Sequence, residues 1–341
     1  MNWYIKRTGQ ALFTIWSVIT IAFVLAWNIP GSIVEKMIAR MAQSGGGGSR
    51  EVIRESIESR LMFDPNASIF EAYVTYMTEL AQGNLGYSIV ASKNVSAEIA
   101  DTLPWTLLVM SLATLGMFAI SLSLGAIMAY REGSRFDLAN TIVGTVTTSI
   151  PYFVAALLLI LWVGHSDAPI LELFPEAGRR PAKYQIEPGL TLAYAWGVLR
   201  HATLPALSYI ITGYGLLALS MRGNSIQTLG EDYVRVAELR GLPSRRIALR
   251  YVGRNAVLPL YTSLLLAVGS MLGASVVLEQ IFQYKGIGYR MFQAINNSDI
   301  TLMMGTFIVI SVCMVISTFI ADVTYSFLDP RIKSGDQGEA Y

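Results

Sequence analysis

Seven arginines gather around one short stretch of this 341-residue chain, and long apolar runs flank the stretch on both sides. Residues 231–259 read EDYVRVAELRGLPSRRIALRYVGRNAVLP. A guanidinium group stays charged and binds carboxylates and phosphates through paired hydrogen bonds. The chemistry that this stretch offers is therefore recognition of an acidic partner surface or of lipid headgroups. The seven are Arg222, Arg235, Arg240, Arg245, Arg246, Arg250 and Arg254.

The sequence lacks the motifs that would make the chain an enzyme or an ion-coupled carrier. It has no phosphate-binding loop, no nucleophile elbow, and two widely separated histidines, His165 and His201. The single cysteine, Cys313, cannot form a disulfide within the chain. Coupling ions usually bind at ionisable residues near the membrane midplane, and none is predicted there. We therefore expect no catalytic residue, no metal site and no bound cofactor, and we expect another subunit to supply the energy.

Composition indicates a protein embedded in lipid. Hydrophobic residues make up 53% of the chain and charged residues only 14%, against about 25% charged in soluble domains. A helix needs about 20 apolar residues to cross the hydrocarbon core. Six stretches qualify or nearly qualify, so we predict an all-α integral membrane protein with six spans. These are residues 9–29, 103–130, 138–163, 204–221, 256–278 and 302–328.

Lysine and arginine in the short loops predict the orientation of the spans. Basic residues precede the first span, follow the sixth, and lie between the second and third and between the fourth and fifth. With six spans all of these segments fall on one side, so we expect both termini in the cytoplasm. A net charge of +1 implies no nucleic-acid partner. The residues concerned, beside the seven arginines, are Lys6, Arg7, Arg131, Arg135, Arg331 and Lys333.

We expect three consecutive parts along the chain. Residues 1–30 form the N-terminal tail and first span, 31–102 an extracytoplasmic segment, and 103–341 the core with a cytoplasmic loop at 222–255. Within the outer segment, a glycine-serine run at 44–49 fits either a mobile binding loop or a slack connection. Apolar residues at helical spacing within 52–61 predict a short amphipathic helix.

Helical spacing also predicts the local structure of the arginine-rich loop. Val234 and Ala237 with Leu239, then Leu242, form an apolar edge at roughly helical spacing, with charges elsewhere. Gly241 can end the helix in the left-handed conformation, and Pro243 suits the start of the next helix. We therefore expect a short helix, a sharp corner, and a second helix that leads into the fifth span. So short a helix needs a surface to pack on.

This loop resembles that of the permease subunits of ATP-binding-cassette importers. Their pattern, Glu-Ala-Ala-x-x-x-Gly followed by Leu-Pro, matches at Ala237, Gly241 and 258–259, although Arg235 and Val236 replace its Glu and first Ala. The string Tyr-Val-Arg-x-Ala-x-x-x-Gly-Leu is similar to that of the dipeptide and oligopeptide branch. The segments 83–109, 278–305 and 328–332 resemble the same branch, and in particular its B-like subunit.

The resemblance implies a type I importer permease fold and a set of partners. We expect a second, C-like permease subunit, two ATP-binding subunits that carry ATP and Mg, and an extracytoplasmic substrate-binding protein. The chain would lie in a prokaryotic inner or plasma membrane. Pro151, within the third predicted span, either kinks that helix beside the path or is merely tolerated in packing.

The resemblance also implies roles for particular residues. Helix 231–242 would dock on an ATPase, with Val234, Ala237 and Leu242 as apolar contacts and Gly241 as the corner. Arg235, Arg245 and Arg246 would pair with the ATPase, contact lipid headgroups, or merely keep the loop inside. The full set for coupling is Glu231, Tyr233, Val234, Arg235, Ala237, Gly241, Leu242, Arg245 and Arg246. For the binding protein the set is Tyr284, Gly286 and Gly288, of which the two glycines would permit a tight outer turn.

The substrate stays open at this level, as does one other class of transporter. Systems for peptides, oligosaccharides and nickel share these permease motifs. Four aromatic residues around the fourth predicted span could stack on a sugar or anchor the helix at the interface. A stand-alone channel or secondary carrier is the remaining alternative, and it would transport without any ATPase. The aromatic residues are Tyr194, Trp196, Tyr209 and Tyr214.

Overall fold

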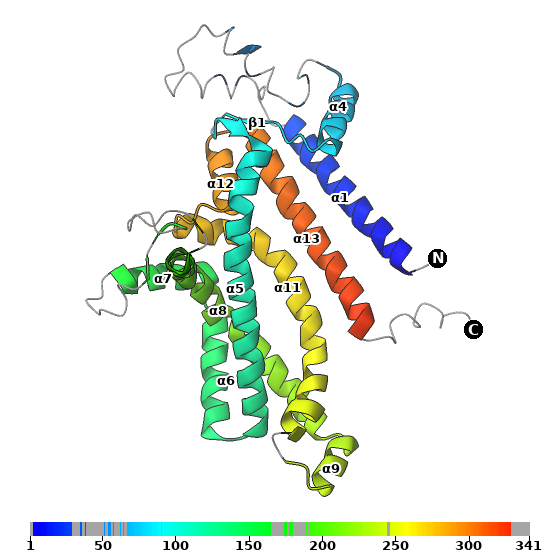
Figure 1. The fold of residues 1–341 in the computed structure, drawn as a ribbon, viewed down its shortest axis with the longest axis vertical. Coiled ribbons are helices and arrows are strands. Elements are labelled where there is room, and N and C mark those ends of the chain that lie inside the picture. The colour runs from blue at the N-terminus through cyan, green and yellow to red at the C-terminus, as the bar shows by residue number, and fades with distance from the viewer. Residues whose placement is uncertain are drawn as a thin grey trace. The chain divides into compact units, whose positions relative to one another are not determined.

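The computed structural model describes residues 3–28, 67–89, 91–164, 191–243 and 246–328, with single positions or short runs between 35 and 64 and between 174 and 189. This part of the chain is helical almost throughout, as Figure 1 shows. The strands within it are β1, Tyr87–Ser88, and β2, Lys93–Asn94, which pair antiparallel. The predicted all-α fold is confirmed.

Four helices in the described ranges are long and apolar enough to cross a membrane. They cover the first, second, fourth and sixth predicted spans. Helix α11, Arg254–Ile281, covers the fifth. The exact number of crossings stays a prediction. The four helices are α1, Trp3–Trp27, α5, Val95–Tyr130, α8, Leu192–Leu229, and α13, Ile300–Leu328.

The third predicted span is not one continuous helix. It consists of α6, Arg135–Thr148, and α7, Tyr152–Gly164, which meet at 98°. Pro151 lies at the break, has no N–H to continue the α6 ladder, and disfavours helix at the residue before it. Its carbonyl instead accepts the N–H groups of Val154 and Ala155 and so starts α7. The prediction of a single helix over 138–163 was wrong, whereas a kink at Pro151 is confirmed.

The fourth predicted span is longer than expected. Helix α8 has 38 residues and includes most of the run 190–199, which hydropathy suggested was a separate lead-in. Thr191 caps it by accepting the N–H of Tyr194. Hydropathy therefore located only the apolar middle of α8. The more polar turns at both ends continue the same α-helical hydrogen bonds, which hydropathy does not detect.

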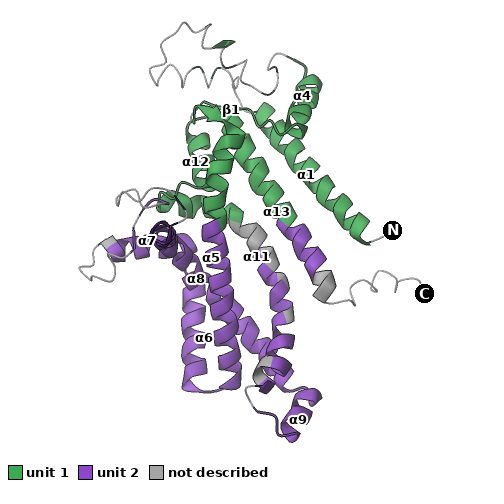
Figure 2. Cartoon of the chain, in the orientation of Figure 1, with its two compact units in different colours: residues 1–107, 272–316 green, residues 108–271, 317–341 purple. Residues whose placement is uncertain are grey.

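The described chain divides into two compact units, coloured separately in Figure 2. Unit 1 joins residues 1–107 to 272–316 and holds α1, the hairpin, helix α4, Ile69–Ala81, and helix α12, Ile287–Asn296. Helix α4 begins with a capping box between Ser68 and Glu71. Two apolar clusters form the core of this unit. The first centres on Phe23, Tyr76 and Met304, and the second on Val95, Ile287 and Leu302.

Unit 2 joins residues 108–271 to 317–341 and contains α6 to α9. Helices α6 and α8 approach very closely, because a Cβ on Gly215 would lie 2.1 Å from the carbonyl oxygen of Gly144. Helix α9 spans Asp232–Leu239, and a π-helix, η2, Ile247–Gly253, leads directly into α11. The predicted sequence of short helix, corner and second helix is confirmed.

Several predictions fall outside the described residues. These concern the glycine-serine run 44–49, most of the helix predicted at 52–61, Arg245, and residues 329–332 at the C-terminal motif. The predicted parts 1–30, 31–102 and 103–341 follow the order of the chain. Each compact unit instead joins two stretches that are far apart in sequence.

Candidate functional site

One face of α9 is buried against the chain itself. Val234 and Ala237 are 1% and 2% exposed and pack with Ile247 and Val252, which lie in η2. Leu242 packs against the edge of the same cluster. The resemblance implied Val234, Ala237 and Leu242 as apolar contacts for an ATPase. In this structure the three side chains pack α9 against η2, and their contact with a partner stays a prediction.

A second face of α9 exposes a different set of apolar side chains. Tyr233 and Val236 are half-exposed, and Leu239 is 81% exposed. Charged residues surround them, namely Glu231, Asp232, Arg235, Glu238 and Arg240, all exposed. An exposed apolar patch with a polar rim is typical of an interaction site. Sequence periodicity grouped Leu239 with Val234 and Ala237 in one edge, whereas the structure buries Val234 and Ala237 and exposes Leu239.

The corner after α9 is a Schellman motif. The N–H of Gly241 donates to Glu238 O (2.8 Å), and the N–H of Leu242 donates to Ala237 O (3.3 Å). Gly241 has φ +70°, and a Cβ there would meet nothing within 4 Å. Glycine is thus favoured at this position by its backbone conformation and not by lack of space. The predicted left-handed corner at Gly241 is confirmed.

A small polar cluster connects α9 to the start of α11. Asn255 donates from Nδ2 to Tyr233 Oη (2.6 Å) and to Tyr251 O (3.2 Å). Tyr251 lies in η2. π-helices are rare in proteins, and many of those that occur lie at functional sites. These contacts and the buried cluster hold α9 in a defined orientation on η2.

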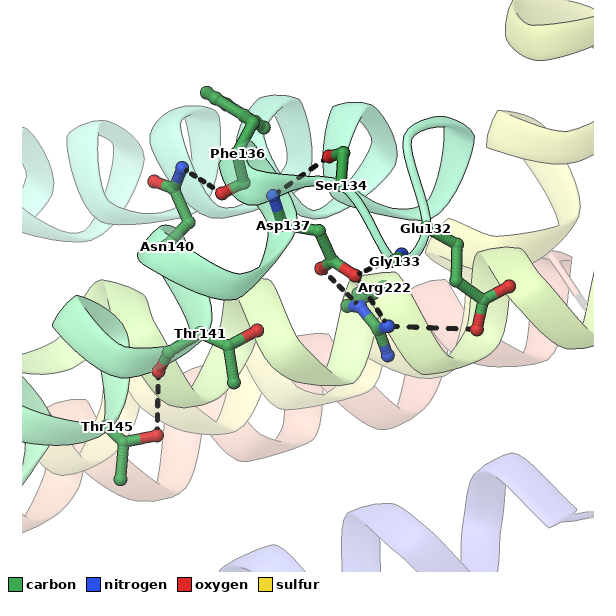
Figure 3. A network of polar contacts seen from close by, with 9 residues as sticks. All are labelled: Glu132, Gly133, Ser134, Phe136, Asp137, Asn140, Thr141, Thr145 and Arg222. Atoms are coloured by element: carbon green, nitrogen blue, oxygen red, sulfur yellow. Dashed lines mark hydrogen bonds and ion pairs between the residues drawn. The ribbon is translucent and has the colours of Figure 1, made fainter.

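An ion pair ties the C-terminal part of α8 to the start of α6 (Figure 3). Arg222 donates from Nε to Asp137 Oδ1 (2.6 Å) and from Nη2 to Asp137 Oδ2 (2.8 Å). Glu132 lies 3.7 Å from the same guanidinium. Asp137 also accepts the N–H of Gly133, and its own N–H donates to Ser134 Oγ (3.2 Å). Such a bidentate pair fixes both side chains in one geometry.

Sequence reasoning missed Asp137. The spacing of Ser134 and Asp137 is a usable signal for a helix start, since Ser134 is the N-cap of α6. The pairing with Arg222, 85 residues away, has no signal in a single sequence. For Arg222 the sequence suggested recognition of a partner or of lipid headgroups, or a topology signal, whereas the structure places it in this pair.

The other predicted coupling residues lie as follows. Glu231 is the N-cap position of α9 and makes no side-chain cap hydrogen bond. Arg235 and Arg246 are exposed, on α9 and just before η2. Arg245 is outside the described residues. The assignment of these residues to a partner contact stays a prediction.

Tyr284, Gly286 and Gly288, which were predicted to contact the binding protein, are all buried in unit 1. A Cβ on Gly286 would lie 2.3 Å from Thr106 Oγ1, and one on Gly288 would lie 2.7 Å from the backbone of Val276. Both glycines therefore permit close approach. The left-handed residue of the turn is Gln283, with φ +46°. A partner at this loop would meet the exposed Gln283 and Lys285 first.

The N-terminus of α12 is capped by side chains from two other helices. Thr106 Oγ1 accepts the N–H of Ile287 (2.9 Å) and donates to Glu279 Oε1 (2.5 Å). Glu279 Oε2 accepts the N–H of Tyr289 (2.7 Å). These bonds satisfy two of the amide groups that a helix start leaves without intrahelical partners. Sequence reasoning placed Glu279 at the end of a span but gave it no role.

Residues 121–334 match the family of binding-protein-dependent transport system inner membrane components. The chain is 30% identical to the di/tripeptide transport system permease protein DppB of Pseudomonas aeruginosa, over 98% of this chain and 99% of that protein. It is 31% identical to the dipeptide transport system permease protein DppB of Bacillus subtilis, over 99% of both. It is 29% identical to the oligopeptide transport system permease protein AppB of that organism, over 96% and 98%.

Two independent findings agree with the resemblance read from the loop. The family match covers more than half of the chain, and full-length relatives align from end to end. The fold is accordingly the type I importer permease fold, in a multi-pass membrane protein. The chain belongs to the family of binding-protein-dependent transport system inner membrane components.

Proposed function

We propose that this chain is the B-like permease subunit of an ATP-driven importer and forms half of the path for di- or oligopeptides. The named relatives support peptide as the substrate class over oligosaccharide or nickel, since they are peptide permeases by name. The energy comes from two separate ATP-binding subunits, which carry ATP and Mg.

Helix α9 is the element that one ATP-binding subunit grips. Its apolar patch of Tyr233, Val236 and Leu239, with charges around it, is the observation that carries this proposal. A groove rim with charges of both signs would complement the patch, with acidic groups opposite Arg235 and Arg240 and basic groups opposite the acidic side chains of α9. An eight-residue helix is too short to be stable alone, so its own packing on η2 and a partner must both support it.

Movement of α9 passes into the membrane through three fixed connections. The cluster of Val234 and Ala237 joins α9 to η2, and η2 continues into α11. Asn224 donates from Nδ2 to Ala256 O (3.2 Å), which ties α8 to α11. The pair of Arg222 and Asp137 ties α8 to α6. ATP binding biases access to the path only if the ATPases hold α9 differently in the two states.

The remaining partners and the placement follow from the same proposal. A C-like permease subunit completes the path, and an extracytoplasmic binding protein delivers the substrate near the loop that exposes Gln283 and Lys285. The complex lies in a prokaryotic inner or plasma membrane, with both termini of this chain in the cytoplasm.

The proposal is tested by replacing the most exposed residue of the patch. Leu239→Glu should reduce co-purification of the ATP-binding subunits at least tenfold and abolish uptake, because it puts a charge into an apolar contact. Ile295→Glu is the matched control, since it charges a half-exposed apolar residue on the other short helix, α12. The control should leave ATPase co-purification unchanged.

Two outcomes would contradict the proposal. Full co-purification in Leu239→Glu would remove the docking role of α9. Uptake in membranes that lack the ATP-binding subunits would favour a stand-alone carrier or channel. Neither result depends on the identity of the transported peptide.

A further inference from the structure

Helix α4 has three distinct faces, although the sequence places it in a segment outside the membrane. Ala72 and Tyr76 are buried in the cluster that contains Phe23, and Tyr73 and Leu80 pack against that cluster. A second stripe is apolar but not buried, and a third is polar and exposed. The apolar stripe is Phe70, Val74, Met77 and Ala81, and the polar stripe is Glu71, Thr75, Thr78 and Gln82.

Both stripes follow the same spacing of four, three and four residues, so each lies along one side of the helix. Phe70 is 73% exposed and Val74 is half-exposed, whereas Met77 is partly covered. Leaving these apolar side chains in water would forgo the favourable free energy of removing them from water. The division into one apolar and one polar side is typical of helices that lie at a membrane surface.

The contacts of α4 fix its depth relative to α1. Tyr73 Oη and Thr20 Oγ1 are 2.8 Å apart and share a hydrogen bond. The ring of Phe23 lies 5.4 Å from that of Tyr73 and 5.3 Å from that of Tyr76. Thr20 lies two turns before Trp27, the last residue of α1, which is about 10 Å at 1.5 Å per residue. Helix α4 therefore lies beside the C-terminal part of α1 and not beyond its end.

That part of α1 belongs to a membrane span and exposes apolar side chains of its own. Ile21, Val24 and Leu25 are exposed at the level where α4 packs. We expect lipid around these side chains, because α1 is a helix long and apolar enough to cross the bilayer. The hydrogen bond between Tyr73 and Thr20 is consistent with a position within the bilayer. An unpaired hydroxyl is costly in hydrocarbon, and this bond pairs both hydroxyls.

We propose that α4 is a membrane-interface helix. Its apolar stripe contacts the acyl chains of the leaflet that surrounds the C-terminal end of α1, and its polar stripe faces water. With 13 residues, or about 20 Å, it is too short to cross the hydrocarbon core. Part of the segment 31–102 is thus bound to the bilayer surface, independently of what the importer carries.

The test compares the two stripes within the assembled importer, reconstituted in nanodiscs of phosphatidylethanolamine and phosphatidylglycerol. In a Cys313→Ala background, which removes the single cysteine, a spin label is attached at Phe70→Cys or Val74→Cys. Thr75→Cys and Thr78→Cys are the matched controls on the polar stripe of the same helix. Labels on the apolar stripe should collide several-fold more with oxygen, which dissolves in lipid, than with a water-soluble nickel chelate. The controls should show the reverse ratio.

Two results would overturn the proposal. Equal access of the nickel chelate to both stripes would place α4 in water. Exclusion of both reagents from the apolar stripe would mean that another protein covers it. If one apolar position does not tolerate cysteine, Met77→Cys reports on the same stripe.

Discussion

The two short helices α9 and α12 are held in place by different kinds of contact. Each connects long helices, and neither N-cap residue makes a side-chain cap bond of its own. The start of α12 is held by the buried side chains of Thr106 and Glu279. Helix α9 is held by one small apolar cluster, a glycine corner and exposed hydrogen bonds between Tyr233, Tyr251 and Asn255, and it leaves its other face exposed.

The difference separates a fixed helix from one that is available to a partner. Buried hydrogen bonds to a carboxylate require one geometry and are costly to break. A small apolar cluster is less directional, so it tolerates small rearrangements when a partner binds. We therefore expect substitutions around α12 to act mainly on stability and substitutions around α9 to act mainly on coupling.

The largest effect is expected from Glu279→Ala, because it leaves the N–H of Tyr289 and the hydroxyl of Thr106 without their acceptor. The free energy of unfolding should fall by about 3 kcal/mol. Glu279→Gln keeps one acceptor oxygen, so its free energy of unfolding should fall less. Thermal unfolding of the purified complex in detergent measures both. Equal melting temperatures for wild type and Glu279→Ala would show that the cap does not hold α12.

A somewhat smaller loss is expected from Gly286→Ala. The new Cβ would lie 2.3 Å from Thr106 Oγ1 and 2.5 Å from Glu279 Oε1, so the cap must shift. Overpacking of this kind costs about 2 kcal/mol. Gly273→Ala is the control, because a Cβ there meets nothing within 4 Å and alanine favours the helix. Thermal unfolding of the purified complex measures this loss as well. A Gly286→Ala variant that melts at the wild-type temperature would argue against tight packing at this site.

At α9, Gly241→Val should destabilise the corner locally by about 1–2 kcal/mol, since a left-handed residue with a branched side chain is strained. Hydrogen exchange of the α9 amides should accelerate, while the overall melting temperature changes little and uptake falls. Gly241→Asn should behave more like wild type, because asparagine tolerates this conformation. Slow exchange in the valine variant would mean that the corner does not set the position of α9.

The smallest effect is expected from Tyr233→Phe, which removes the exposed hydrogen bond from Asn255 (2.6 Å) and a longer one to Tyr251 O (3.5 Å). We expect a loss of about 0.5 kcal/mol. A double-mutant cycle with Asn255→Ala isolates the pair, and the double variant should be no worse than Asn255→Ala alone. Full additivity of the two single losses would show that the two side chains do not interact.

Much of the region around α9 could be predicted because its signals are local. The spacing of Val234 and Ala237 predicted a helix, and Gly241 predicted its left-handed end. Pro151 likewise marked the position of a break, although its 98° angle depends on packing. Predicted spans were less accurate at their ends, as α8 shows, because hydropathy does not detect polar helical turns.

The contacts that fix α12 and the start of α6 could not be predicted in the same way. Glu279 caps a helix eight residues further along the chain, together with Thr106 from another helix. Asp137 pairs with Arg222 across 85 residues of sequence. A single sequence does not contain these pairings, since they depend on how helices pack against one another.

The sequence by itself determined where apolar helices form, where they break and which loop collects the arginines. Those features depend on side-chain type and on neighbours three or four residues apart. Only the tertiary structure decided which edge of α9 is covered, why Gly286 must lack a side chain, and that α4 lies beside α1. The physical reason is that burial and hydrogen bonding between distant segments depend on the packing of whole helices, which local periodicity does not specify.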